Sequence, residues 1–205
     1  METTNVKSRV RKYGLTGLLT VFLVLGGVAL ALSADDRKVE TIDATAQGTG
    51  TQLGKTVNVK VTIYEFSTAE DKDLLTTAFK QGGNKGLVNA LTKMKSVGRI
   101  AITGTLGYDL SYIGLVTTPT GRKIRFVTNR QLRFGEVYSN AQSVAYNLTA
   151  GEITINDADK SKTEGVLYPA AQLVINKQGD LQIELRKNPW KLLNIIDWNQ
   201  AGTAK

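Results

Sequence analysis

The 205-residue chain contains no cysteine and no histidine, although its hydrophobic share of 41% is ordinary for a folded protein. Without cysteine it can form no disulfide, no thiolate metal site and no thiol nucleophile. The absence of histidine removes the commonest general base, the commonest metal ligand and every Ser-His-Asp arrangement. We therefore expect a protein that is not an enzyme and that uses no cofactor.

The first 34 residues differ from the rest of the chain. Four basic residues precede an uncharged run over residues 15–32, which is followed by Ser33 and Ala34. A basic start, an apolar run and small residues are typical of a bacterial export signal, although this run nearly reaches the length of about 20 residues that spans a bilayer. We expect residues 1–34 to contact the membrane or the export machinery, as a cleaved signal or as a retained N-terminal anchor. Both alternatives place the remainder outside the cytoplasm, either periplasmic or secreted, or anchored to the inner membrane.

The net charge of the whole chain is +8. The first 34 residues account for +3 of this charge and leave +5 on the part that we expect to be exported. Because the excess is modest and the expected location is extracytoplasmic, we do not expect nucleic acid as a partner.

The remainder divides into three segments. Residues 35–56 are rich in Thr, Ala, Gln and Gly without an apolar period, which predicts a flexible linker. Residues 57–198 form one expected domain, and residues 199–205 a polar tail.

The expected domain begins with an alternating strand over residues 57–63. A capping box formed by Ser67 and Glu70 predicts a helix that ends at Gly82-Gly83, and Asn84 can cap a second helix. Period-two patterns predict strands near 98–106, 108–117, 122–129, 136–148, 152–157, 165–176 and 180–186. Asn188-Pro189 indicates a short terminal helix or turn. The expected fold is α+β: an antiparallel meander sheet, curved or partly closed, covered by a helix pair inserted after the first strand.

Two sets of residues are candidates for binding. Inward residues of the strands would line an apolar pocket if the sheet encloses one, and would otherwise be plain core: Val59, Val61, Ile102, Phe126, Leu173 and Ile183. Basic residues on and near one hairpin would bind an anionic envelope component or a protein partner: Arg99, Arg122, Lys123, Arg125, Arg130 and Arg133. The alternative for the second set is the solvated face of a strand, since Lys123 and Arg125 alternate with Ile124 and Phe126.

Three further patterns have both a structural and a functional interpretation. The apolar cluster over residues 190–198 is core or a docking patch. An acidic loop at 157–164 lacks the glycine and the bidentate glutamate of a calcium loop, so no metal is expected. The acids Glu65, Asp109, Glu136 and Glu152 would serve a carboxylate-based hydrolase only if two of them faced each other in one cleft.

Three stretches, VTIYEFSTAEDK (61–72), GRIAITGTLGYD (98–109) and NPWKL (188–192), resemble uncharacterised exported bacterial proteins of acidobacterial type. The resemblance covers most of residues 57–198 and implies export and a single domain, without an activity or a site. The element order is also similar to that of helix-grip lipid-binding folds and fatty-acid-binding barrels, by fold analogy alone. The sequence therefore predicts an exported envelope protein that binds an apolar or anionic ligand, with an interaction module using the basic hairpin as the alternative.

Overall fold

A computed structural model describes residues 39–132, 146–175, 181–185 and 188–201. Within this part, no helix is long and apolar enough to cross a membrane. The expected export segment, residues 1–34, lies outside the described residues, as does most of the strand expected at 136–148.

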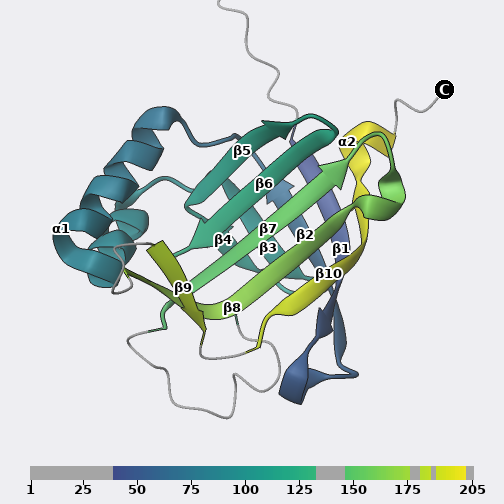
Figure 1. The fold of residues 1–205 in the computed structure, drawn as a ribbon, viewed down its shortest axis with the longest axis horizontal. Helices are drawn as coiled ribbons and strands as arrows, with labels where there is room; N and C mark the ends of the chain where they lie inside the picture. Colours follow the sequence, from purple (N-terminus) through teal and green to yellow (C-terminus); the bar gives the residue numbers. More distant parts are fainter. Residues whose placement is uncertain (1–38, 133–145, 176–180, 186–187, 202–205) are drawn as a thin grey trace, which may run out of the picture. The chain divides into compact units, whose positions relative to one another are not determined.

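The described strands pair only antiparallel, in one sheet (Figure 1). Their bounds are β1 Glu40–Gly48, β2 Thr56–Ile63, β3 Gly98–Ile102, β4 Tyr108–Leu110, β5 Tyr112–Thr118, β6 Gly121–Thr128, β7 Leu148–Asn156, β8 Glu164–Ile175, β9 Leu181–Leu185 and β10 Trp190–Asp197. The order across the sheet is β4-β3-β2-β1-β10-β8-β7-β6-β5, and β9 pairs with β8 off this path. The helices are α1 Ala69–Lys93 and the short α2 Trp198–Ala201.

The sheet curls until its two edges approach each other without pairing. The edge strands β4 and β5 are consecutive in the chain and only Ser111 separates them. The backbone N–H of Ser111 donates to the carbonyl of Val127 in β6 at 3.2 Å, which ties this corner across the gap. In Figure 1 the strands β5 to β8 lie in front of β1 to β4. The expected antiparallel α+β sheet is confirmed, and it is nearly closed.

The expectation of a flexible linker over residues 35–56 is wrong for Glu40–Gly48, which form β1 near the middle of the sheet. Every second residue of β1 is buried, and Ile42, Ala44 and Ala46 point into the core. Because two of these inward side chains are alanines, the strand carries little apolar signal. The folded domain therefore begins before Val57.

The expectation of a short helix or turn after Asn188-Pro189 is also wrong, because residues 190–197 form β10. Trp190 and Leu192 are buried, whereas Leu193 and Ile196 are exposed. This order does not alternate, since the register with β1 shifts between Asp43 and Thr45. The β-bulge therefore interrupts the alternation of buried and exposed residues, so the sequence of this strand has the pattern of neither a regular strand nor a helix.

A single helix, α1, stands in place of the expected pair. Its N-cap is Thr68, one residue after the expected Ser67. The Thr68 hydroxyl accepts from the backbone N–H of Asp71, and the Asp71 carboxylate accepts from the N–H of Thr68. The backbone leaves helical geometry at Gly83, with φ 56° and ψ −148°. Glycine tolerates this conformation, so α1 is divided into two arms at the Gly82-Gly83 pair.

The interior of the curled sheet is filled by side chains. Eighteen buried apolar residues contact one another there, among them Ile42, Ile63, Ile124, Phe126 and Trp190. A second, smaller cluster lies where α1 packs against the sheet, around Leu75, Leu87, Leu91 and Leu148. The larger cluster fills the interior of the sheet, and the smaller one lies between α1 and the sheet.

Candidate functional site

An apolar cavity of about 210 Å³ lies between α1 and the outer face of the sheet. Both arms of α1 contribute to it, together with β5, β6 and β8. The lining residues are Lys72, Leu75, Thr76, Phe79, Leu87, Leu91, Tyr112, Val127 and Leu173. Val127 faces this cavity because its neighbours Phe126 and Thr128 point into the sheet interior.

Charged groups surround this apolar cavity. Lys72 is exposed, while Tyr112 is half-buried. Burial raises the pKa of the Tyr112 hydroxyl, and the charge of Asp71 adds to the rise whereas Arg125 opposes it. Asp71 and Arg125 therefore act electrostatically on a residue of the cavity wall. The wall itself is apolar, and charges of both signs lie beside it.

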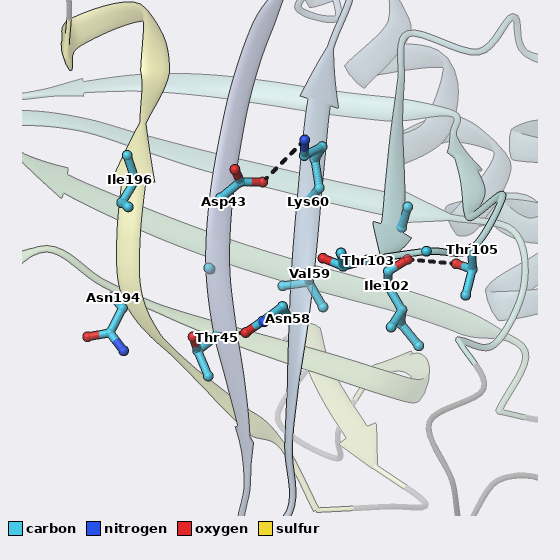
Figure 2. A pocket seen from close by; sticks show the side chains of 13 residues that line it. Asp43, Thr45, Asn58, Val59, Lys60, Ile102, Thr103, Thr105, Asn194 and Ile196 are labelled. Carbon is cyan, nitrogen blue, oxygen red and sulfur yellow. Dashed lines mark hydrogen bonds and ion pairs between the residues drawn. The ribbon is translucent and has the colours of Figure 1, made fainter.

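A second hollow, of about 450 Å³, lies on the outer surface of β1, β2, β3 and β10 (Figure 2). Carbon makes up most of its lining, and we call it the polar hollow for the charged, amide and hydroxyl groups that stand in it. Figure 2 shows Asn194 and Ile196 on β10, Asp43 and Thr45 on β1, and Asn58 and Lys60 on β2. The remaining lining residues are Ala44, Val59 and residues 101–105. Half of the labelled side chains carry a hydroxyl or an amide.

The polar groups of this hollow hold one another in place. The ammonium of Lys60 lies 3.8 Å from the carboxylate of Asp43. The indole N–H of Trp198, at the start of α2, donates to the other oxygen of Asp43 at 2.7 Å. The Thr45 hydroxyl donates to the amide oxygen of Asn58 at 3.2 Å. A charge pair that is neutral as a whole therefore sits among uncharged donors and acceptors.

The β-bulge of β10 borders this hollow. Leu193 pairs with Thr45 and Ile196 with Asp43, so two residues of β10 stand opposite Ala44 alone. Asn194 occupies the bulge with φ 51°, the one positive φ of a non-glycine residue in the described segments. Asparagine tolerates this left-handed conformation better than most side chains do. The extra residue turns Asn194 and Ile196 outward.

The same shift turns Asp197 inward, where it meets Glu40 and Arg122. The Arg122 guanidinium donates to both carboxylate oxygens of Glu40, at 2.6 and 3.1 Å, and also to Asp197. The Glu40 and Asp197 side chains are only 8% and 6% exposed. Burial raises the pKa of Glu40 above its ordinary value, and Asp197 adds to this rise while Arg122 opposes it. We call these three residues the inner ionic cluster.

A second group of charges lies on the opposite face of β6. The carboxylate of Glu152 accepts from Lys123 at 2.8 Å and from Arg125 at 2.7 Å. Partial burial acts to raise the pKa of Glu152, but the hydrogen bonds and charges of Lys123 and Arg125 together outweigh it and lower this pKa. We call these three residues the outer ionic cluster.

The structure separates the six expected pocket residues. Val59, Val61 and Phe126 are buried in the packed interior, where they touch other core residues. Ile102 packs against the same core and lines the polar hollow. Leu173 lines the apolar cavity beneath α1. Ile183 is 41% exposed on β9, so its expected inward position is wrong.

The six basic residues do not form one surface either. Arg122 points inward to the inner ionic cluster, whereas Lys123 and Arg125 share Glu152 outside. Arg130 is exposed beside Asn129. Arg99 is half-buried on β3. Arg133 lies outside the described residues. The expected alternation of Lys123 and Arg125 with Ile124 and Phe126 is confirmed.

The four acids considered for a hydrolase do not face one another in a described cleft. Glu65 pairs with Lys95 at 2.9 Å and Glu152 with Lys123 and Arg125, while Asp109 is exposed and Glu136 lies outside the described residues. The loop at 157–164 pairs its own acids with Lys160 and Lys162, at 3.7 and 3.2 Å. In the described segments no group of three or more acids could hold a metal ion.

Sequence reasoning missed the inner ionic cluster and the polar hollow. Glu40 and Arg122 lie 82 residues apart, and no local pattern marks them as neighbours. Only the alternation of β6 could have placed Arg122 on the face of Ile124 rather than with Lys123.

Comparisons with protein-family models, with curated proteins and with solved structures find no match to this chain.

Proposed function

We propose that this protein is an exported, non-enzymatic envelope protein that binds a small anionic amphiphile. Its apolar part would occupy the cavity beneath α1, and its charged group would remain at the surface beside Lys72. The apolar cavity of about 210 Å³ is the observation that carries this proposal. Export is supported by the basic and apolar composition of residues 1–34.

The size and lining of the cavity limit the ligand. A dry apolar cavity of about 150 Å³ accepts a single benzene ring in another protein. This cavity is larger and is lined mainly by aliphatic and aromatic carbon, so a short acyl chain or one ring would fit. Each methylene that enters it would contribute about 0.8 kcal/mol.

The charges near the cavity favour an anionic head group. Lys72 lines the cavity and is exposed, so its ammonium can reach a head group that stays in water. The charges of Asp71 and Arg125 act on Tyr112 in opposite directions, and Arg125 is paired with Glu152, so Lys72 is the cation that carries this preference. A carboxylate or phosphate attached to a short apolar chain matches both the apolar cavity and this cation.

The broken helix supports the same proposal. Leu75 and Phe79 come from the first arm of α1, whereas Leu87 and Leu91 come from the second. Gly83 lies between the two arms and has no side chain to restrict their angle. Asn84, next to Gly83, accepts from the backbone N–H of Leu173 at 3.0 Å, which holds the second arm against β8 at the cavity wall.

The interaction module on the basic hairpin has less support. Arg122 forms ion pairs with the carboxylates of Glu40 and Asp197. Glu152 neutralises part of the charge of Lys123 and Arg125. An anionic partner would have to compete with acids that already occupy these cations.

Calorimetric titration of the full-length protein with straight-chain carboxylates of increasing length tests the proposal. Affinity should rise with chain length up to an optimum and then fall. Leu173→Phe should fill the cavity and abolish this binding. Ile183→Phe is the matched control, because Ile183 pairs with Leu173 across β8 and β9 but is exposed.

A second comparison tests the charge. Lys72→Gln should weaken binding of a carboxylate but leave the alcohol of equal chain length unaffected. The absence of any saturable binding, or equal losses in Leu173→Phe and Ile183→Phe, would contradict the proposal.

A further inference from the structure

We infer that the polar hollow on β1, β2, β3 and β10 is a separate binding site for a neutral saccharide. This inference is independent of the cavity beneath α1, since no residue lines both. It rests on the backbone at Asn194, on the balance of charge in the hollow, and on the apolar side chains at its border.

The backbone at Asn194 is the first argument. A glycine would adopt φ 51° without steric cost, yet an amide side chain stands there and lines the hollow. Asparagine is one of the few other residues that adopt this conformation readily, so the position accepts an amide where most side chains would be strained. β-Bulges occur beside functional sites, where they redirect a side chain. Here the bulge directs Asn194 out of the core and into the hollow.

The charge balance is the second argument. Lys60 and Asp43 lie 3.8 Å apart, so the two charged groups of the hollow compensate each other. The other polar side chains are uncharged amides and hydroxyls, which can both donate and accept hydrogen bonds: Thr45, Asn58, Thr103, Thr105 and Asn194. Sugar hydroxyls also donate and accept, whereas an ion would require a surplus of one charge.

The apolar border is the third argument. Ile196 is 44% exposed and lines the hollow, and Trp198 is 53% exposed and donates to Asp43 of the same hollow. A pyranose ring presents apolar C–H groups on its faces and hydroxyls at its edge. Ile196 supplies an apolar surface beside the amides and hydroxyls of the hollow, and the indole N–H of Trp198 holds the carboxylate of Asp43 in place next to them. The volume of about 450 Å³ lies within the range of small-molecule sites, about 300–1,000 Å³.

Ligand-observed NMR and calorimetry on the full-length protein test this inference. The probes are short neutral oligosaccharides of glucose, mannose, galactose and N-acetylglucosamine. At least one should bind saturably. Asn194→Gly keeps a residue suited to the bulge and removes only the amide, so it should weaken binding by about tenfold. Trp198→Ala should also weaken it, because Asp43 loses the indole N–H that holds its carboxylate in the hollow.

Leu193→Ala is the matched control, since Leu193 is exposed on the same strand next to the bulge but does not line the hollow. It should leave affinity unchanged, and unfolding midpoints of the variants should confirm that each is folded. The inference is overturned if no oligosaccharide binds, if Asn194→Gly binds as the unmodified chain does, or if Leu193→Ala costs as much as Asn194→Gly.

Discussion

The two ionic clusters on either side of β6 contain the same kinds of groups in opposite proportions. Inside, one guanidinium, Arg122, serves the two carboxylates of Glu40 and Asp197. Outside, one carboxylate, Glu152, serves the two cations of Lys123 and Arg125. Side-chain exposure is 6–20% in the inner ionic cluster and 28–58% in the outer one. Adjacent residues of one strand, Arg122 and Lys123, thus contribute to very different environments.

The difference shows how burial changes the pKa of a paired carboxylate and the contribution of the pair to stability. The pKa of Glu40 is raised because burial disfavours its charged form, even with an arginine on both of its oxygens. The pKa of Glu152 is lowered because it is more exposed and its two cations outweigh the burial. A buried pair is costly to break, whereas an exposed pair contributes little to stability.

The largest expected effect comes from Arg122→Met. It leaves two carboxylates close together and largely buried without a cation, which should lower the free energy of unfolding by about 3–5 kcal/mol. Denaturant titration measures this loss. Arg125→Met on the same strand is the control and should cost less than about 1 kcal/mol. Equal losses would mean that the inner ionic cluster is not distinct from the outer one.

A smaller effect is expected for Glu40→Gln. The amide removes one of two like charges and keeps a polar group beside Arg122, so the loss should stay below about 2 kcal/mol. The same titration compares it with Arg122→Met. A larger loss for Glu40→Gln would show that Asp197 alone cannot balance the guanidinium.

Glu152→Gln should change stability by less than about 1 kcal/mol, and the change should shrink as salt is added. Its Lys123 and Arg125 partners are exposed enough to be solvated without it. Unfolding in low and high salt measures this effect. A loss of stability that does not depend on salt would mean that Glu152 behaves like the residues of the inner ionic cluster.

The last expected difference is that the stability contributions of Glu40 and Glu152 change with pH in opposite directions. The raised pKa of Glu40 means that its contribution is favourable below the ordinary value of 4.5 and is lost as the pH rises through the raised pKa. The lowered pKa of Glu152 means that its contribution is present above 4.5 and is lost as the pH falls through the lowered pKa. Stability curves of Glu40→Gln and Glu152→Gln, each subtracted from that of the unmodified chain, should therefore slope in opposite directions. Parallel slopes would contradict both assignments.

Much of the sheet could be predicted from the sequence because side-chain alternation is a local signal. The β2 alternation appears as expected, and the patterns near 98–106, 122–129, 152–157, 165–176 and 180–186 correspond to β3, β6, β7, β8 and β9. The single strand expected at 108–117 is divided into β4 and β5 at Ser111. β1 escaped detection because alanine carries a weak apolar signal at two of its inward positions. β10 escaped because its bulge changes the alternation half-way along the strand.

The two candidate sites were less predictable than the strands. Leu173, one of the candidate pocket residues, lies beneath α1 rather than inside the sheet. Asn194 carries no local signal, since its positive φ follows from the pairing of β10 with β1. A pocket wall combines residues from several strands, and one-dimensional patterns do not specify which strands meet.

By itself, the sequence determined the absence of cysteine and histidine chemistry, the period-two strands and the two faces of β6. These properties depend on residue type and on the alternation of neighbouring side chains, which the chain carries locally. Only the tertiary structure decided that β1 and β10 pair, that the sheet nearly closes, and that Glu40, Arg122 and Asp197 meet. Those contacts join residues more than 70 positions apart, and they form only when the whole sheet curls.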